Sequence, residues 1–260
     1  MDAHACAGPA SVTAGLDIGQ GDAILLRSPE GAAAVVDTGP PGSPAPVVAA
    51  LRRQGVTRLD ILVMTHDSLD HIGGVTDILG RFPVGLVLHP PDPVDGWEPA
   101  ARAAIAAVGE RGVPIRVIRA GSRLALGRWG IRVLSPAGRR PVGADPNPYS
   151  LIARASAGSL DVLLTADAES DALSRVVTGS VDVLKVSHHG SEDPGLPEEL
   201  TRLLPRVALI SAGDNNPFRH PRPQTLAALA ARGVSTWRTD LSGDVTVVMD
   251  RGALAVSGTR

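Results

Sequence analysis

The chain has 260 residues, a formal net charge of −2 at pH 7, 43% hydrophobic residues and 20% charged residues. This composition excludes an intrinsically disordered chain, and the length allows one large α/β domain or two small ones. The nearly balanced charge gives no support for nucleic-acid or membrane binding through net charge, so such binding would need a local basic patch.

The sequence also bears on disulfides, membrane spans and a secretory signal. Cys6 is the only cysteine, so an intrachain disulfide is excluded and we expect no cysteine-based partner. No apolar run approaches the roughly 20 residues that span a bilayer. Residues 1–10 lack the basic and apolar regions of a secretory signal. We therefore expect a soluble domain over residues 12–260, preceded by a flexible tail over residues 1–11.

Short apolar runs alternate with helix-like segments along the chain. The apolar runs predict strands at residues 11–17, 22–28, 32–37, 58–64, 84–88, 113–118, 130–134, 150–156, 160–165, 181–186, 206–211, 233–238 and 244–249. Helices are predicted at residues 44–54, 72–81, 97–111, 169–177, 196–204 and 222–232. Continuous apolar runs such as 59–64 are typical of strands covered on both faces, whereas 22–37 and 150–165 have hairpin spacing. Together these patterns predict an α/β sandwich with mixed sheets and outer helices.

Residues 65–74, with the sequence THDSLDHIGG, concentrate polar side chains between a buried strand and a helix. Open α/β sheets place ligands at this end of their strands. His66, Asp70 and His71 lie close enough in the chain to converge on one cation. The alternative is a polar loop in which Asp70 caps the next helix. Two of only seven histidines lie in this turn, which favours metal binding.

Three further residues follow predicted strands. Asp167 ends an apolar strand, where a buried carboxylate is costly unless a cation or hydrogen bonds compensate it. Its alternative role is the N-cap of helix 169–177. His188 and His189 end the strand 181–186, and adjacent side chains leave a strand on opposite faces, so we expect only one to face a metal. We favour His188, with His189 as a supporting or phosphate-binding group.

These segments resemble motifs of the metallo-β-lactamase superfamily, and in particular of the ComEC family of DNA-uptake proteins. The matching segments, in order, are residues 16–23 (LDIGQGDA), 36–39 (VDTG), 65–74, 164–167 (LTAD), 185–191 (KVSHHGS), 210–213 (ISAG) with Asn216, 220–221 (HP) and 238–240 (RTD). The resemblance covers about residues 12 to 250. It implies an αββα sandwich of two mixed sheets, a metal-dependent hydrolase, an Asp37 that orients the ligand loop, and an Asp167 that bridges two metals or holds the second.

The chain departs from the superfamily pattern at two positions. Ser68 replaces the second histidine of the HxHxDH motif, and Asn147 with Ser150 stands where the third-motif histidine is missing. By resemblance, one metal position keeps Asp70, His71, Asp167 and either His188 or His189. The other keeps His66, Asp167 and weak oxygen ligands from Ser68 and Asn147. We expect one or two divalent ions, and the oxygen-rich set without thiolate favours Mn²⁺ while still allowing Zn²⁺.

The leading hypothesis is hydrolysis of a phosphodiester, most specifically of single-stranded DNA, with Asp70 and Asp167 orienting the attacking water. His220 is expected to bind substrate phosphate or to protonate the leaving group, and the alternative is a structural role. The expected substrate-binding residues are Asn147, Ser150, Ser191, Asn216, Arg219 and His220, with Phe218 available to stack on a base.

Two alternatives remain open. One is a small phosphodiester as substrate, and the other is a catalytically degenerate binding or assembly domain, for which Ser68 is the main argument. A segment of a ComEC-like transporter would act beside a membrane channel domain on the extracytoplasmic face, whereas a free-standing protein would be cytoplasmic.

Overall fold

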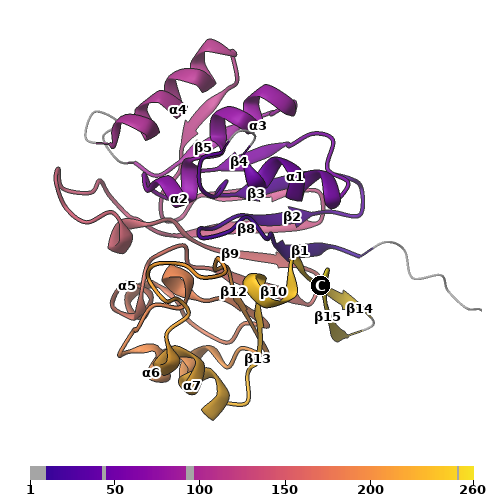
Figure 1. Ribbon diagram of the computed structural model, residues 1–260, viewed down its shortest axis with the longest axis vertical. Coiled ribbons are helices and arrows are strands. Elements are labelled where there is room, and N and C mark those ends of the chain that lie inside the picture. The colour runs from indigo at the N-terminus through magenta and orange to yellow at the C-terminus, as the bar shows by residue number, and fades with distance from the viewer. Residues whose placement is uncertain (1–9, 43–44, 92–96, 251) are drawn as a thin grey trace, which may run out of the picture.

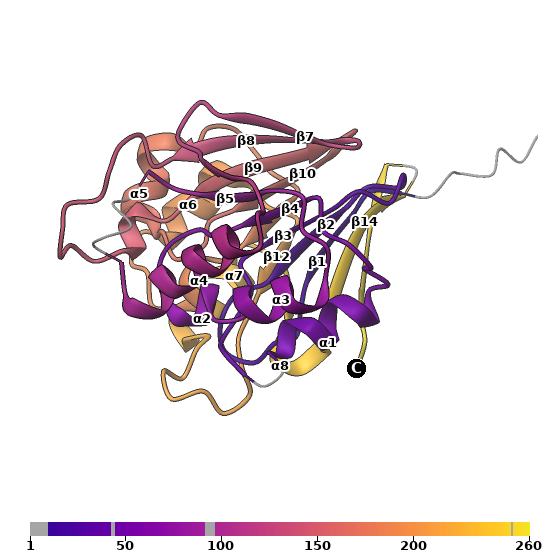
Figure 2. The same ribbon diagram turned by 90° about the horizontal axis from the view of Figure 1, so that it is seen from above.

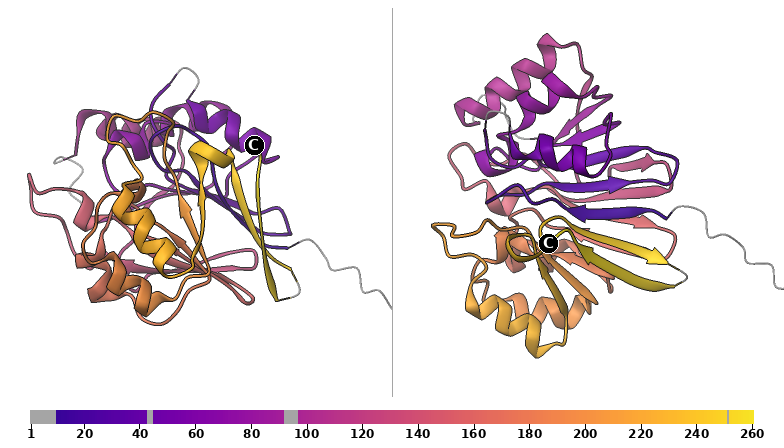
Figure 3. Two further views of the ribbon diagram at one scale, coloured as in Figure 1. Left: turned by 60° about the horizontal axis from the view of Figure 1, so that its bottom comes forward. Right: turned by 45° about the vertical axis from the view of Figure 1, so that its right-hand side comes forward.

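The computed structural model describes residues 10–42, 45–91, 97–250 and 252–260. Two β-sheets pack face to face, and helices cover both outer faces, so the described chain forms four layers (Figure 1; Figure 3, right). This architecture confirms the predicted αββα sandwich of two mixed sheets. The predicted tail at residues 1–11 lies outside the described residues up to residue 9, as do His4 and Cys6.

The first sheet contains eight described strands in the order β15-β14-β1-β2-β3-β4-β5-β6. Neighbours from β15 to β3 are antiparallel, and those from β3 to β6 are parallel. The strands are β1 (Val12–Gly15), β2 (Ile24–Arg27), β3 (Ala33–Val36), β4 (Ile61–Val63), β5 (Val87–His89), β6 (Ile115–Val117), β14 (Val245–Asp250) and β15 (Ala253–Gly258).

The second sheet contains seven described strands in the order β13-β12-β11-β10-β9-β8-β7. Strands β10 to β13 are parallel, whereas β7 to β10 form an antiparallel meander. The strands are β7 (Arg123–Leu126), β8 (Trp129–Ser135), β9 (Ile152–Ala157), β10 (Leu160–Leu164), β11 (Val183–Lys185), β12 (Val207–Ile210) and β13 (Ser235–Arg238).

The helices divide between the two outer layers. The helical elements are α1 (Pro46–Arg53), α2 (Leu69–Ile72), α3 (Val75–Arg81), α4 (Pro99–Glu110), the 3-10 turn η2 (Asn147–Tyr149), α5 (Ser170–Val176), the 3-10 turn η3 (Ser187–Gly190), α6 (Leu196–Leu203), α7 (Pro223–Ala231) and α8 (Thr239–Ser242). Helices α1, α3 and α4 pack on the first sheet, and α5, α6 and α7 pack on the second. In the described part of the chain, no helix has both the length and the apolar character needed to cross a bilayer.

Three apolar cores separate the four layers, and strand β4 shows how one strand serves two of them. Ile61 and Val63 point between the two sheets, whereas Leu62 points under the helices of the first sheet. Side chains alternate along a strand, so a strand that is buried on both faces must be apolar at every position. The apolar run at 61–64, which begins after Asp60, is therefore explained by burial on both faces, as its sequence indicated.

The helix predicted at residues 72–81 is divided into α2 and α3. Gly73 and Gly74 lie at the division, where the backbone of the loop after β3 approaches closely. A Cβ at Gly73 would clash with the backbone nitrogen of Pro41, and one at Gly74 would lie 2.5 Å from the carbonyl oxygen of Thr38. The two glycines therefore allow two loops to meet beside the ligand segment.

Candidate metal centre

Loops that follow parallel strands of both sheets meet at one edge of the molecule. Asp37 follows β3, the segment from His66 to His71 follows β4, Asp167 follows β10, and the His188–His189 pair follows β11. Since β3 is parallel to β4, and β10 to β11, these loops leave the carboxyl ends of neighbouring strands. This is where open α/β sheets place their ligands.

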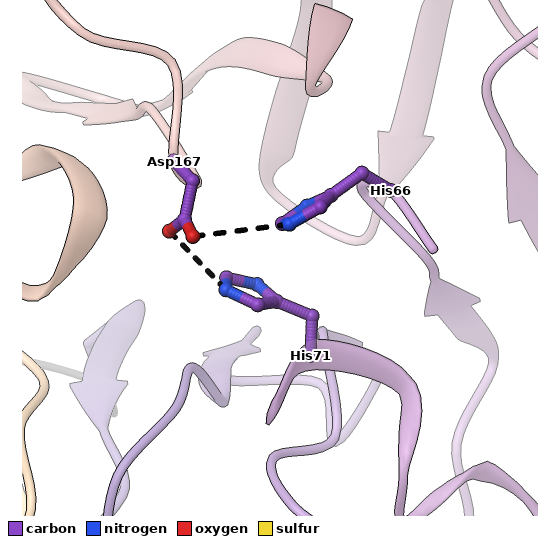
Figure 4. A group of neighbouring side chains, drawn as sticks. All are labelled: His66, His71 and Asp167. Carbon is purple, nitrogen blue, oxygen red and sulfur yellow. Dashed lines mark ion pairs between the residues drawn. The ribbon is translucent and has the colours of Figure 1, made fainter. Parts of the chain in front are cut away.

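Five side chains converge there, and we call His66, Asp70, His71, Asp167 and His189 the histidine–aspartate cluster. The Nε2 atom of His71 lies 3.2 Å from Asp167 Oδ1, and the Nε2 atom of His66 lies 3.8 Å from Asp167 Oδ2 (Figure 4). His189 Nε2 lies 3.2 Å from Asp70 Oδ2 and 3.7 Å from Asp167 Oδ1. Ligand atoms of His66, His71 and Asp167 lie within 4.8 Å of one another, as do those of Asp70, His71 and His189.

The buried atoms of this cluster fit a bound cation. The Nε2 atoms of His66, His71 and His189 and the Oδ1 atom of Asp167 are buried and have no hydrogen-bond partner among the described residues. Buried polar atoms without a partner are rare in folded proteins and need an explanation, such as an ion. Imidazole nitrogens and carboxylate oxygens are ligands for Zn²⁺ and Mn²⁺. The donor set therefore fits one or two divalent cations.

Asp37 fixes the orientation of the ligand segment from outside the cluster. Its Oδ1 accepts the backbone N–H of Thr65 at 2.8 Å, and its Oδ2 accepts the Thr65 hydroxyl at 2.6 Å. The Nδ1 atom of His71 lies 2.7 Å from the same Oδ2. A proton on Nδ1 would be donated to this carboxylate, which leaves the Nε2 lone pair of His71 facing Asp167.

Replacing Asp37 with Asn is expected to weaken divalent metal binding about 10- to 100-fold, the usual cost of losing a group that orients a ligand. The amide nitrogen cannot accept the hydrogen bonds that Oδ2 accepts now, so His71 would lose its fixed orientation. Competition with a chromophoric chelator measures the affinity. Unchanged affinity in the folded variant would show that Asp37 does not position His71.

Asp22 and Lys185 form a buried pair beside the cluster that the sequence did not reveal. Asp22 forms an ion pair with Lys185 and lies 3.3 Å from His189 Nδ1, and both partners are almost fully buried. Lys185 Nζ also donates to the carbonyl oxygen of Ala166 at 2.8 Å, next to Asp167. Asp22 thus places a negative charge beside His189, whose Nδ1 has its hydrogen-bond partner in the carbonyl oxygen of Ser211 at 3.0 Å. Its only sequence signal was its place in the motif at residues 16–23.

A second buried ion pair links the loop that carries Asn147 to the ligand segment. Arg140 Nη2 lies 2.8 Å from Asp67 Oδ2, and both side chains are buried. Asp67 lies between His66 and Ser68, so this ion pair links the loop at residues 136–149 to the start of the ligand segment.

Burial and the neighbouring charges shift the pKa values of the histidines in the cluster. Burial lowers the pKa of His189, but the carboxylates of Asp167 and Asp22 outweigh burial and raise it to about 9. For His71 the same competition raises the pKa well above its usual value, through Asp167 and Asp37. Burial and neighbouring His71 lower the pKa of His66 to about 3. A divalent cation would supply the positive charge that protonated His71 and His189 otherwise provide, so its binding would release protons.

The histidine pair differs from the sequence expectation. His188 and His189 have left-handed backbone angles, with φ of 47° and 54°, inside η3, so strand alternation does not apply to them. The buried member is His189, which joins the cluster. His188 is one-third exposed, with its Nε2 3.5 Å from Asn147 Nδ2 and 3.9 Å from Asp167 Oδ2. Strand β11 ends at Lys185, three residues before His188, and the geometry of the turn that follows favours His189 over His188 as the ligand.

A depression of about 140 Å³ opens beside the cluster and is lined by Asn147, Asp167, Glu169 and His188 among others. Glu169, which the sequence did not single out, lies 3.2 Å from His188 Nδ1 and accepts the hydroxyl of Ser191. The imidazole ring of His220 lies 5.5 Å from that of His188, measured between centroids. Asn147, His188 and His220 thus gather on the open side of the cluster.

The other expected ligand and substrate residues have different surroundings. Ser68 precedes α2, and its carbonyl oxygen, not its hydroxyl, accepts the N–H groups of His71 and Ile72. Asn216 bonds the backbone of Gly213 and His220 and so shapes its own loop. The lining of the depression does not include Ser68, Ser150, Asn216 or Arg219.

Comparison with known proteins gives one family and a consistent set of relatives. Residues 16–214 match the family described as the metallo-beta-lactamase superfamily. ComE operon protein 3 of Bacillus subtilis is 31% identical over 251 residues, which cover 88% of this chain and 32% of that protein. Competence protein ComA of Neisseria gonorrhoeae is 28% identical over 256 residues, which cover 94% of this chain and 33% of that protein. The chain thus spans about a third of the length of these curated relatives.

The resemblance to competence proteins inferred from the sequence motifs is therefore confirmed. Among solved structures, CmlA, a diiron beta-hydroxylase from Streptomyces venezuelae, is similar with a TM-score of 0.61 at 17% identity. The match covers 92% of this chain and 54% of that one. At this identity the likeness is one of fold alone.

Proposed function

This chain belongs to the metallo-beta-lactamase superfamily, and on that premise we propose that it is a metal-dependent phosphodiesterase whose substrate is single-stranded DNA during DNA uptake. The observation that carries the hydrolase proposal is the convergence of unpartnered Nε2 atoms of three buried histidines on the Asp167 carboxylate. Bound divalent cations in such sites activate water for attack and neutralise charge on phosphoryl oxygens.

The residues around the cluster have distinct roles in this proposal. His66, His71, Asp167 and His189 would hold one or two divalent ions, Mn²⁺ or Zn²⁺. Asp70 is partly exposed, with a side chain 34% accessible, and lies 3.2 Å from His189 Nε2. It can therefore face both the ion and the open side, where it would orient the attacking water.

His220 is better suited to binding phosphate than to protonating a leaving group. Burial and the neighbouring His188, His189 and Arg222 lower its pKa to about 4. The imidazole is then neutral at pH 7 and can hydrogen-bond a substrate oxygen through an N–H, but it carries no extra proton to donate.

The DNA substrate is supported by the relatives, one of which is named a competence protein. Its similarity to this chain extends over nearly the whole chain and not only over the metal motif. If the chain is a segment of a longer transporter, it would act beside the membrane channel domain on the extracytoplasmic face, whereas a free-standing chain would act in the cytoplasm.

The proposal is tested by incubating the purified chain with labelled single-stranded DNA and Mn²⁺ or Zn²⁺. We expect metal-dependent cleavage, and we expect Asp70→Ala to reduce it to the level without protein. The matched control is Glu110→Ala, because it also replaces a carboxylate with alanine but at an exposed position at the end of α4, away from the cluster. Cleavage that survives Asp70→Ala would contradict the assigned role of Asp70.

A binding or assembly domain without turnover is the second candidate. It is favoured by Ser68, which stands where a histidine is usual and, among the described residues, accepts hydrogen bonds through its carbonyl oxygen while its hydroxyl caps no helix. Metal analysis of the purified protein separates the two, since less than one ion per chain after loading with Mn²⁺ or Zn²⁺ would favour this candidate.

A further inference from the structure

Three arginines stand in a row across the outer face of the second sheet. Arg123 of β7 is the direct cross-strand partner of Arg132 of β8, and Arg132 is the direct partner of Arg154 of β9. Figure 2 shows these strands side by side at the edge of the sheet. Adjacent strands lie about 4.8 Å apart, so the row is about 10 Å long. We call these three residues the arginine row.

The row carries more positive charge than its surroundings neutralise. Arg154 is paired with Asp161 and donates to the carbonyl oxygens of Thr178 and Ser180. Arg123 and Arg132 are exposed, and within the described ranges neither has a carboxylate at ion-pair distance. Like charges directly opposite each other destabilise a sheet. A row of this kind therefore costs stability and calls for an anionic ligand to explain it.

The strands that carry the row lead toward the side of the molecule that carries the metal centre. A depression of about 450 Å³ is lined by Arg123, Arg132 and Arg154 among others. Strand β9 runs from there toward the cluster, and Ser150, which precedes it, lies four residues or about 13 Å from Arg154.

A second depression, of about 270 Å³, is lined in part by Ser135, the last residue of the strand β8 that carries Arg132. It is lined by Arg139, Tyr149 and Arg175 among others. It shares Pro148 with the 140 Å³ depression that contains Asp167 and His188. Tyr149, the only tyrosine of the chain, offers an aromatic ring in the lining of the 270 Å³ depression. The acidic side chains of Asp145 and Asp171 line only the last depression, beside the cluster.

We propose that the arginine row, continued by Arg139, Tyr149 and Arg175, binds the backbone of a single-stranded nucleic acid and leads it into the metal centre. This inference rests on the proposed phosphodiesterase function and deepens it, because it selects a polymer over a small phosphodiester. A small ester needs only the last depression. A strand that passes over all three would meet arginines for its phosphates and an aromatic ring for a base, the combination typical of single-strand binding surfaces.

The test uses the Arg123→Gln/Arg132→Gln double variant, with Arg52→Gln/Arg232→Gln as the matched control. The control removes the same charge from exposed positions in α1 and after α7. Fluorescence anisotropy of a labelled single-stranded oligonucleotide is measured in chelator, so that binding is read without cleavage. Cleavage of the oligonucleotide and of bis(p-nitrophenyl) phosphate is then measured with metal.

We expect the row variant to bind the oligonucleotide about tenfold more weakly than the control, with a salt dependence reduced by about 1.4 in log–log slope, for two lost phosphate contacts. Hydrolysis of bis(p-nitrophenyl) phosphate should be unchanged, and the melting temperature should not fall, because a like-charge contact is relieved.

Each other outcome has a definite meaning. Equal weakening by the row variant and the control would overturn the proposal, because net charge alone would explain binding. Row-dependent binding to phosphatidylglycerol vesicles without binding to the oligonucleotide would also overturn it, in favour of a membrane-facing surface. Absence of cleavage of both substrates would refute the proposed phosphodiesterase function, while the anisotropy comparison would still decide whether the row binds a strand.

Discussion

The Asp167→Asn variant is expected to lose divalent metal binding and hydrolysis together. Asp167 faces all three cluster histidines, with Oδ1 3.2 Å from His71 Nε2 and 3.7 Å from His189 Nε2, and Oδ2 3.8 Å from His66 Nε2. Asparagine would place an amide N–H₂, which has no lone pair for a cation, at one of these oxygen positions. No other described side chain faces all three histidines in this way, so no neighbour can replace it.

Thermal denaturation with and without metal measures this loss. For the wild type, metal at a hundred times its dissociation constant contributes about 2.7 kcal/mol to stability. For a chain of this size that corresponds to a rise in melting temperature of about 5–10 °C. Asp167→Asn should show no rise, while Asp161→Asn at the opposite end of β10 should show the full rise. A wild-type shift retained by Asp167→Asn would contradict the assignment of the metal centre.

Much of the fold could be predicted because each element carries its own local pattern. Strands β3, β4 and β12 are apolar at every position, since both faces are buried, and this made runs such as 61–64 recognisable. Strands β7 and β15 were missed because they lie at sheet edges, where alternate side chains face solvent and the residues carry little apolar signal. Their conformation depends on pairing with β8 and β14, which a local pattern does not encode.

The metal centre was predictable where its residues belong to contiguous motifs, and unpredictable where segments meet only in the folded chain. His66, Asp70 and His71 share one turn and could be inferred together. The choice between His188 and His189 depended on the backbone angles of η3, which no residue type in that turn requires. The pairing of Asp22 with Lys185 joins the loop after β1 to the end of β11, so its partners could be matched only in three dimensions.

The Lys185→Met variant is expected to lose about 3–5 kcal/mol of unfolding free energy, because it leaves a buried carboxylate without its main cation. Burial raises the pKa of Asp22, and Lys185 and His189 together outweigh burial and lower it to about 2. Methionine can fill much of the space of the lysine stem but cannot replace either its charge or its hydrogen bond to Ala166. Denaturant unfolding of the metal-free protein measures the loss, and Arg206→Met, which removes an exposed partner of Asp182, should change stability by less than about 0.5 kcal/mol.

Combining Lys185→Met with Asp22→Asn separates the two roles of Asp22. Removing both charges eliminates the unpaired carboxylate, so the double variant should recover most of the stability that Lys185→Met loses. It should still bind metal more weakly than the wild type, because it loses the negative charge 3.3 Å from His189 Nδ1, although the hydrogen bond between this nitrogen and the Ser211 carbonyl oxygen remains. Recovery of both stability and metal affinity would show that Asp22 serves only to neutralise Lys185. Recovery of stability alone would establish that the Asp22 charge supports metal binding in addition to the hydrogen bond between His189 and Ser211.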